Sequence, residues 1–374
     1  MITYKMADVV KEISVRENNP ATSKYDKFVG LEHYITGEVV IRQYGGTGML
    51  NSAMKVFQAG DILVARRNVY LRRASTVDFD GLTSGDSIVL RAENPRIAKL
   101  LPFILNSDRF WDYADQHADG TMSKRLSPKI LMQYEFTLPS EEEQDRLIEL
   151  LWSMDRTKQA YKQLISATDE LVKSQFIEMF GDRSDAECIT LEKCCDTITG
   201  GSTPSMKHEE FYGGNIPFIK SGDVKSEYVS SGSLWLTDEA LKKTTAKYVP
   251  EGSVIVVVRS GILKHDLPIA ITSNPLVINQ DIKAFHLKEN FTPQYIAWAI
   301  RSQKDMLLNK TRVMTVDNIE SKDLLEIPVM CATLAEQKQF AAFVQQTDKS
   351  KFELNQALEA LNATYKKLIS ENLG

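Results

Sequence analysis

The chain has 374 residues, more than the roughly 100–150 residues of a common single domain, so we expect two or three domains. Its content of 43% hydrophobic and 25% charged residues is typical of globular proteins and excludes collagen-like, low-complexity and wholly disordered chains. The formal net charge of −5 gives no overall basic signature, so any nucleic-acid binding must come from local clusters of cations.

The distribution of apolar residues and cysteines excludes several further classes of protein. The residues at the start of the chain lack the apolar core of a signal peptide, and the longest aliphatic run, Val254 to Val258, is too short to span a bilayer. We therefore expect a cytoplasmic protein with no membrane partner. No Cys-x-x-Cys pair or metal-ligand spacing of histidines is present, so we expect no metal site and no disulfide framework; the cysteines are Cys188, Cys194, Cys195 and Cys331.

The segment 1–139 reads as a compact α/β domain. Short aliphatic runs separated by turn residues predict strands at Ile62 to Ala65 and at Ser87 to Leu90. A helix is expected to open at Asn94-Pro95, because a capping residue precedes a proline that suits the first helical position.

A long helix is predicted for residues 140–181. Ser140 and Glu143 fit a capping box, in which a hydroxyl and a carboxylate satisfy free backbone N–H groups at a helix start. About 40 residues without glycine or proline follow, which corresponds to a rod of roughly 60 Å. A near-heptad apolar stripe predicts packing on another helix or on a partner; its members include Leu147, Leu150, Met154, Leu164 and Leu171.

The second half of the chain follows the same plan. Segment 182–332 predicts strands at Val254 to Val258, Ile269 to Thr272 and Ile282 to Phe285, and a helix that opens at Thr292-Pro293. Segment 333–374 predicts a second long helix, with Thr333 and Glu336 as its capping box. The apolar stripe of this helix includes Phe340, Phe343, Leu354, Leu358 and Leu361.

These similarities form an internal repeat. Glu143-Gln144 recurs as Glu336-Gln337, and the same offset of 193 residues holds without a gap from Lys129 onward. Upstream the offset drifts slightly and pairs Asp86 with Asp281. The predicted fold class is α+β, with two pseudo-symmetric α/β domains separated by two long antiparallel helices that form a coiled coil.

Motifs for catalysis are absent from the sequence. Gly45-Gly46-Thr47-Gly48 lacks the lysine of a phosphate-binding loop and the third glycine of a dinucleotide fingerprint. Ser87 follows Gly85-Asp86, but it opens an aliphatic strand and no histidine partner is evident. No Asn-Pro-Pro-aromatic motif for base methylation occurs. We expect a chain that is not an enzyme.

Basic residues recur in equivalent loops of the two domains. Arginine and lysine can neutralise phosphates or bond guanine edges, so the recurrence makes DNA contact an equal alternative to solvated surface charge, whereas the turn at Lys220 and Ser221 is more typical of an ordinary surface turn. The candidate DNA-binding residues of the first domain are Arg66, Arg67, Arg72, Arg73, Lys124 and Arg125. Those of the second domain are Lys220, Ser221, Arg259, Lys264, Lys310 and Arg312, with Lys310 and Arg312 expected to match Lys124 and Arg125.

The two domains, each followed by a capped helix with Glu-Gln near its start, resemble the specificity subunit of a type I restriction-modification system. The second domain also contains phrases similar to those of the family's target recognition domains: Gly200 to Pro204, Phe218 to Asp223, and Asn279-Gln280-Asp281. The first domain lacks the Gly-x-Thr-Pro phrase. The resemblance covers essentially the whole chain.

The resemblance implies a set of roles and partners. Residues 1–139 and 182–332 would each read one half of a bipartite target in double-stranded DNA, and helices 140–181 and 333–374 would dock two methyltransferase subunits. S-adenosylmethionine would bind in the methyltransferase, with no cofactor in this chain, and restriction subunits would be further partners. The alternative is a protein scaffold whose domains bind other proteins, and an independent hydrolase or nuclease is a more distant third.

Overall fold

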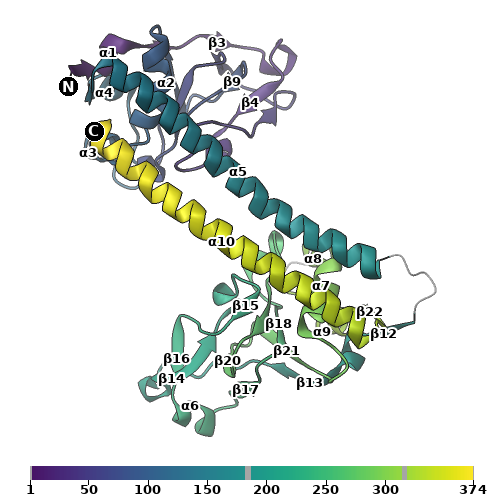
Figure 1. Cartoon of the computed structure of the whole chain (residues 1–374). Coiled ribbons are helices and arrows are strands. Elements are labelled where there is room, and N and C mark those ends of the chain that lie inside the picture. Colours follow the sequence, from purple (N-terminus) through teal and green to yellow (C-terminus); the bar gives the residue numbers. More distant parts are fainter. Residues whose placement is uncertain (1, 182–186, 314–317, 374) are drawn as a thin grey trace. The chain divides into compact units, whose positions relative to one another are not determined.

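The computed structural model describes residues 2–181, 187–313 and 318–373, with side chains given for all of these except 311–313. The chain divides into two compact units: unit 1 comprises Met1–Leu164 with Leu354–Gly374, and unit 2 comprises Ile165–Glu353. Two helices are much longer than the rest, α5 (Glu141–Phe180) and α10 (Leu334–Asn372), and each contributes a part to both units (Figure 1).

Unit 1 combines small sheets with short helices. A four-stranded sheet has the order β2 (Val10–Ile13), β10 (Ser87–Ala92), β7 (Ile62–Ala65), β8 (Ala74–Thr76). A five-stranded sheet has the order β3 (Arg16–Glu17), β6 (Met54–Phe57), β9 (Gly81–Thr83), β4 (Lys27–Val29), β5 (Gly45–Gly46). Strand β1 (Ile2–Lys5) pairs with β11 (Glu135–Leu138). The helices are α1 (Met6–Val9), α2 (Pro95–Ile104), α3 (Asp108–His117) and α4 (Pro128–Leu131).

Unit 2 repeats this arrangement. Its five-stranded sheet has the order β13 (Cys195–Gly200), β21 (Ile282–Leu287), β18 (Val254–Val257), β19 (Ile269–Thr272), β15 (Tyr228–Val229). Its four-stranded sheet has the order β16 (Leu234–Leu236), β14 (Tyr212–Ile219), β20 (Leu276–Ile278), β17 (Tyr248–Val249). Strand β12 (Cys188–Thr190) pairs with β22 (Pro328–Met330). The helices are α6 (Asp238–Lys243), α7 (Pro293–Ser302), α8 (Lys304–Val313) and α9 (Ser321–Leu325).

The strand pairing confirms the internal repeat. In each unit three antiparallel neighbours run in the same order, β10-β7-β8 in unit 1 and β21-β18-β19 in unit 2. In each unit one parallel pair lies in the other sheet: β4 pairs with β9 at Phe28 and Leu82, and β14 pairs with β20 at Phe218 and Val277. Parallel pairs are uncommon in small, mostly antiparallel sheets, so their recurrence identifies equivalent strands.

The long helices begin where the sequence predicts. The Glu143 carboxylate accepts hydrogen bonds from the Ser140 backbone N–H at 3.0 Å and from its hydroxyl at 2.7 Å. The Glu336 carboxylate accepts the equivalent bonds from Thr333 at 2.9 and 2.8 Å. Both capping boxes are therefore formed, and each satisfies a donor that the first helical turn leaves free.

The glutamine that follows each of these glutamates is buried and holds the helix to the preceding segment. The Gln144 amide donates to the Pro139 carbonyl at 2.9 Å, and the Gln337 amide donates to the Ala332 carbonyl at 3.0 Å. Gln337 also accepts the Thr292 N–H at 2.9 Å. A buried amide needs such partners, so the repeated Glu-Gln pair has a structural cause at both helices.

In each unit, parts of α5 and α10 pack together through one apolar seam. In unit 1 the buried members are Leu147, Leu151, Met154, Tyr365, Ile369 and Leu373. In unit 2 they are Val172, Phe176, Phe180, Phe340 and Val344. The two segments run antiparallel in unit 2, because α10 bonds Asp169 through Lys351 and contacts Phe180 through Phe340. The described residues contain no helix that is long and apolar enough to cross a membrane.

The structure corrects part of the predicted stripe. Leu147, Met154 and Phe340 are buried as expected, and Phe343 and Leu361 are partly buried against the cores. Leu354 and Leu358 are half-buried. Leu150, Leu164 and Leu171 are 48–52% exposed, however, and do not belong to the seam. The seam instead follows alternating steps of four and three residues from Leu147, so the adjacent residues Leu151, Ile165 and Val172 face the seam in their place.

The mixed α and β composition, the two sheet-rich units and the long helices confirm the predicted fold class. A polar residue interrupts the seam: Lys158 is buried, and its ammonium lies 4.4 Å from the Tyr365 ring centroid. Burial lowers the pKa of Lys158, and the cation–aromatic contact compensates part of the desolvation.

Candidate nucleic-acid interface

In unit 1, the loop that follows β7 meets the segment 119–126 and forms a cluster of arginines. Arg67 and Arg125 pair through their backbones in an isolated β-bridge. Their guanidinium groups share one carboxylate: Arg67 Nη1 lies 3.4 Å from Asp86 Oδ2, and Arg125 Nη2 lies 2.5 Å from Asp86 Oδ1. The Arg66 N–H donates to the Asp86 carbonyl at 2.9 Å, so the backbone also fixes this corner.

A strained turn extends this loop. Asn68 and Arg72 have φ angles of 55° and 48°, in the left-handed region that residues with a Cβ rarely adopt. The 3₁₀ turn Val69–Leu71 lies between them and presents Tyr70, which is 64% exposed. The Ser123 hydroxyl donates to Asn68 Oδ1 at 2.9 Å and joins the turn to segment 119–126. Strain of this kind is typical of functional loops.

The predicted cations of unit 1 fall into two groups. Arg72 bonds Asp108 and Asp112 of α3 at 2.5 and 3.1 Å, and the Lys124 ammonium bonds Asp115 at 2.7 Å. The Arg73 guanidinium donates to the carbonyls of Leu31 and Arg67 at 3.0 and 3.2 Å. These three cations bond acceptors of their own unit.

Arg66, Arg67 and Arg125 form the second group and carry more positive charge than their carboxylate partners balance. Burial, together with the nearby Arg125 cation, lowers the pKa of Arg66, although a guanidinium keeps its charge at neutral pH. Arg66 Nε is buried with no hydrogen-bond partner. Arg73 Nε is buried without a partner in the same way, so the accessible donors of this group are those of the half-exposed Arg67 and Arg125, which are suited to an anionic ligand.

Unit 2 contains the equivalent corner. Arg259 follows β18 as Arg67 follows β7, and its Nε lies 3.8 Å from Asp281 Oδ1. The N–H groups of Val258 and Arg259 donate to the Asp281 carbonyl at 2.8 and 3.2 Å. Asp281 Oδ2 also accepts the Asn279 amide at 3.0 Å. The β-bridge partner of Arg259 is Asn318.

That bridge corrects one predicted equivalence. Asn318, and not Lys310 or Arg312, occupies the position of Arg125 in the repeat. Lys310 lies on α8 and forms an ion pair with Asp323 at 2.5 Å. The side chain of Arg312 is outside the described residues, and Lys264 is an exposed residue at the end of the turn Gly261–Lys264. The offset of 193 residues that relates Lys129 to Lys322 also relates Arg125 to Asn318, so the sequence contained the signal for this pairing, but asparagine carries no charge that would have drawn attention to it.

Three phrases that are far apart in the sequence converge near Asp281. The Asn279 N–H donates to the Ile219 carbonyl at 2.9 Å, so the turn that starts with Lys220 and Ser221 adjoins Asn279. The Ser202 N–H donates to the Ile278 carbonyl at 3.1 Å. A Cβ at Gly201 would lie 2.0 Å from the Asn279 carbonyl oxygen, so only glycine allows this close approach.

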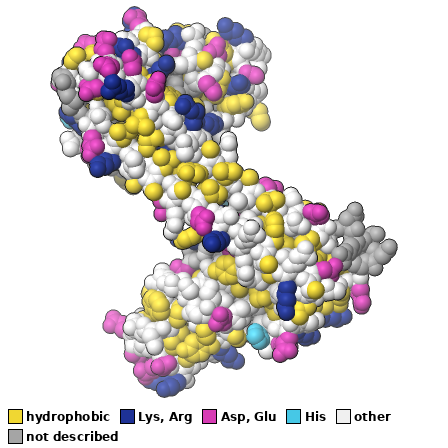
Figure 2. Space-filling model, viewed as in Figure 1, with side chains coloured by type: hydrophobic (Ala, Val, Ile, Leu, Met, Phe, Trp, Pro, Cys, Tyr) yellow, Lys and Arg dark blue, Asp and Glu magenta, His cyan; other side chains and the backbone are white. Residues whose placement is uncertain are grey.

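Sequence reasoning paired Asp86 with Asp281 in the repeat but did not assign them to the site. The available signal was that each aspartate precedes an aliphatic strand that pairs with the arginine-bearing strand. On the face of the molecule drawn in Figure 2, lysine and arginine side chains are interspersed with aspartate and glutamate. Local geometry therefore distinguishes the site more clearly than a broad basic patch would.

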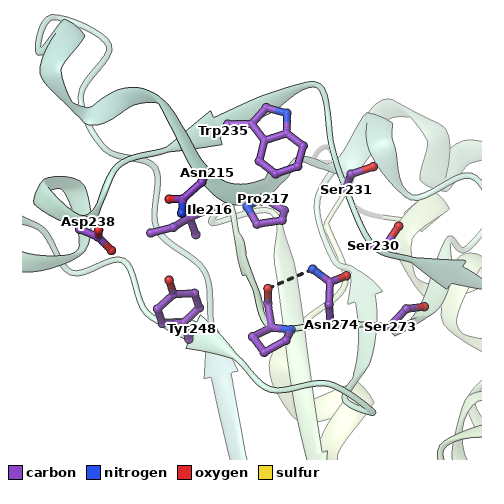
Figure 3. Close-up of a pocket in the computed structure, with 11 residues that line it drawn as sticks. Asn215, Ile216, Pro217, Ser230, Ser231, Trp235, Asp238, Tyr248, Ser273 and Asn274 are labelled. Carbon is purple, nitrogen blue, oxygen red and sulfur yellow. Dashed lines mark hydrogen bonds between the residues drawn. The ribbon is translucent and has the colours of Figure 1, made fainter.

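A separate cavity of about 840 Å³ lies in unit 2. In the view of Figure 3, Trp235 lies above Pro217, and Tyr248 and Asn274 lie below it. Asn274 Oδ1 is buried without a partner. Asp238 is the charged residue among those that line the cavity, so it offers no cation for a phosphate and is distinct from the arginine site.

Comparison with known proteins places this geometry in context. Residues 184–362 match the family model described as the type I restriction modification DNA specificity domain. The chain is 33% identical over 152 residues to the type I restriction enzyme EcoR124I/EcoR124II specificity subunit of Escherichia coli, a match that covers 40% of this chain and 38% of that subunit.

Two further relatives agree. The MjaIX specificity subunit of Methanocaldococcus jannaschii is 26% identical over 172 residues, which cover 44% of this chain and 39% of that subunit. The chain thus spans about two fifths of the length of the curated relatives in these matches. The crystal structure of a type I restriction-modification S subunit from M. genitalium shares the fold, with a TM-score of 0.58, 14% identity and coverage of 98% of this chain and 94% of that one. These findings confirm the resemblance inferred from the repeat and the capped helices.

Proposed function

We propose that the chain is the DNA-recognition subunit of a type I restriction-modification system, because residues 184–362 match the family model of type I restriction modification DNA specificity domains. It binds double-stranded DNA at a specific sequence and directs partner subunits to that sequence. The chain itself performs no chemical step and binds no cofactor. Its place of action is the cytoplasm.

The observation that carries this proposal is the recurrence of one strand-end arginine corner in two repeat-related units. Arg67 and Arg259 follow equivalent strands, contact equivalent aspartates and remain more than half exposed. Arginine can bond the O6 and N7 atoms of guanine with two parallel N–H groups, or neutralise a phosphate. A duplicated surface of this kind is suited to a target with two specified parts.

The target is therefore bipartite. Each unit reads one short block, and the two blocks have opposite orientation because the repeat gives the units equivalent surfaces. The centres of the blocks are about one turn of DNA apart, or a little more, which is the spacing at which two linked readers meet the same side of a duplex.

The long helices bind the partners. Leu150, Leu164 and Leu171 are large apolar side chains left about half exposed on α5, and their separations are multiples of seven residues. Such a face is suited to packing against helices of methyltransferase subunits, of which two copies match the two units. The methyltransferase supplies S-adenosylmethionine and methylates adenine, and restriction subunits join the same assembly.

Duplex binding by the chain together with its methyltransferase partner tests the proposal. We expect selection from a random-sequence duplex library, at one stated ionic strength, to return two specified blocks around an unspecified spacer. Sequencing of methylated adenines in cells that contain the complex should return the same motif. A single contiguous motif would contradict the bipartite target. Partner binding without any selected sequence would favour the alternative, a protein scaffold.

A further inference from the structure

Each strand-end arginine rests on an aspartate that occupies the same place in the repeat. We propose that Asp86 and Asp281 are positioning residues that orient Arg67 and Arg259 toward a guanine edge, one in each half of the target. The inference rests on the proposed function, because it names the residues that give the arginine site its base preference.

The aspartates are held from two sides. Their backbone carbonyls accept N–H groups from the arginine-bearing segments at 2.8–3.2 Å. Their own N–H groups donate to side chains two residues earlier, Ser84 Oγ at 3.2 Å for Asp86 and Asn279 Oδ1 at 3.3 Å for Asp281. Each carboxylate is therefore fixed in place before DNA arrives, as a positioning group must be.

A positioning residue should be less exposed than the side chain that it orients, and the aspartates and arginines fit this expectation. The carboxylates of Asp86 and Asp281 are 24% and 21% exposed, whereas the side chains of Arg67 and Arg259 are 51% and 57% exposed. A largely buried acceptor thus lies beneath an accessible donor. A guanidinium has five N–H donors in one plane, so the group that contacts aspartate retains outward donors for a base edge.

Electrostatics alone argues against aspartates at a DNA-binding surface. A carboxylate repels phosphates, so its removal should strengthen binding to any duplex if net charge were its main contribution. Orientation is the property that a carboxylate adds, and it matters more for two parallel bonds to guanine than for contact with a phosphate. The presence of the pair in both units therefore favours base reading.

One of the differences between the two corners offers a matched control. In unit 1, Asp86 carries a second guanidinium, that of Arg125, at 2.5 Å. In unit 2 the equivalent residue is Asn318. The substitution Arg125→Asn gives unit 1 the residue that unit 2 already has and leaves the contact between Asp86 and Arg67 in place.

The test uses the chain with its methyltransferase partner and a random-sequence duplex library at fixed ionic strength. We expect Asp86→Asn to weaken the preference for guanine at one position of one block by roughly 5- to 150-fold, the range of one bidentate base contact. Asp281→Asn should do the same in the other block. Affinity for duplex that lacks the motif should stay the same or rise.

Arg125→Asn should instead lower affinity for all sequences and reduce the salt slope by about 0.9, with base preferences unchanged. Arg67→Lys keeps the charge but loses the planar donor fork, so it should reproduce the loss seen with Asp86→Asn, and it replaces that variant should Asp86→Asn fold poorly. Retained guanine preference, or uniformly tighter binding, in the aspartate variants would overturn the inference. A wild-type complex that selects no motif would instead overturn the proposed function.

Discussion

We expect Leu164→Asp to weaken binding of the proposed methyltransferase partner without disturbing the fold, because Leu164 is 51% exposed in the chain. Complete burial of a leucine contributes about 1.5–3 kcal/mol, so contact of the exposed half with a partner is worth about 1 kcal/mol. A carboxylate in the same dry contact would cost about 2 kcal/mol or more in addition. A total of about 3 kcal/mol corresponds to a loss of roughly 100-fold in affinity for the methyltransferase. Titration calorimetry or co-purification with that subunit measures the loss.

Leu151 provides the matched control on the same helix. It is fully buried in the unit 1 core, so Leu151→Asp should lower the free energy of unfolding by several kcal/mol. Leu164→Asp should change the free energy of unfolding by less than about 0.5 kcal/mol, as surface substitutions do. Wild-type affinity of Leu164→Asp for the methyltransferase would refute the assignment of this face. Equal destabilisation by the two variants in urea would refute the seam.

Three further outcomes are expected. Phe340→Ala should destabilise unit 2 by about 3–5 kcal/mol in urea unfolding, because the ring is fully buried. Phe352→Ala on the same helix should cost less than about 0.5 kcal/mol, because Phe352 is exposed. Similar costs for the two variants would contradict the burial pattern. Burial, and then the neighbouring Glu227 charge, raise the pKa of Asp348 to about 6. The folded state therefore binds this proton more tightly than the unfolded state, so the stability that this group contributes is lost as pH rises from about 4 to 6. Asp348→Asn should remove that part of the pH dependence of the free energy of unfolding. Arg259→Ala should weaken duplex binding. Loss of a phosphate contact would lower the salt slope by about 0.9, whereas loss of a base contact would cost about 1–3 kcal/mol at one base position. Unchanged binding would show that this loop is not part of the interface.

The two long helices and the most aliphatic strands were predictable because local signals determine them. The capping pair Ser140 and Glu143 needs four consecutive residues, and the strand Ile62–Ala65 needs four aliphatic or small side chains that are all buried. The helix seam was less certain because Leu150 and Leu151 are adjacent and equally apolar. Only packing against α10 decides that Leu151 faces inward.

The candidate site residues also divide into those that a sequence pattern can indicate and those that depend on tertiary contacts. Recurrence singled out Arg67 and Arg259 as candidates, since a repeat can be read from one sequence, and their contact with DNA stays a prediction. The sequence could not show that Arg72 bonds Asp108 and Asp112, because those acceptors come from a helix that is distant in the chain. The roles of Asp86 and Asp281 depend on an ion pair across neighbouring strands, which pattern alone does not reveal.

The composition of unit 1 has a consequence for the order of synthesis. Residues from the beginning of the chain form most of this unit, but its core also contains Tyr365, Ile369 and Leu373, which are synthesised after the whole of unit 2. Unit 2 lies wholly within Ile165–Glu353 and can close earlier. Until residues 354–373 have been synthesised, the apolar surface of unit 1 that receives the end of α10 stays uncovered. A product that stops before residue 354 would keep this surface exposed.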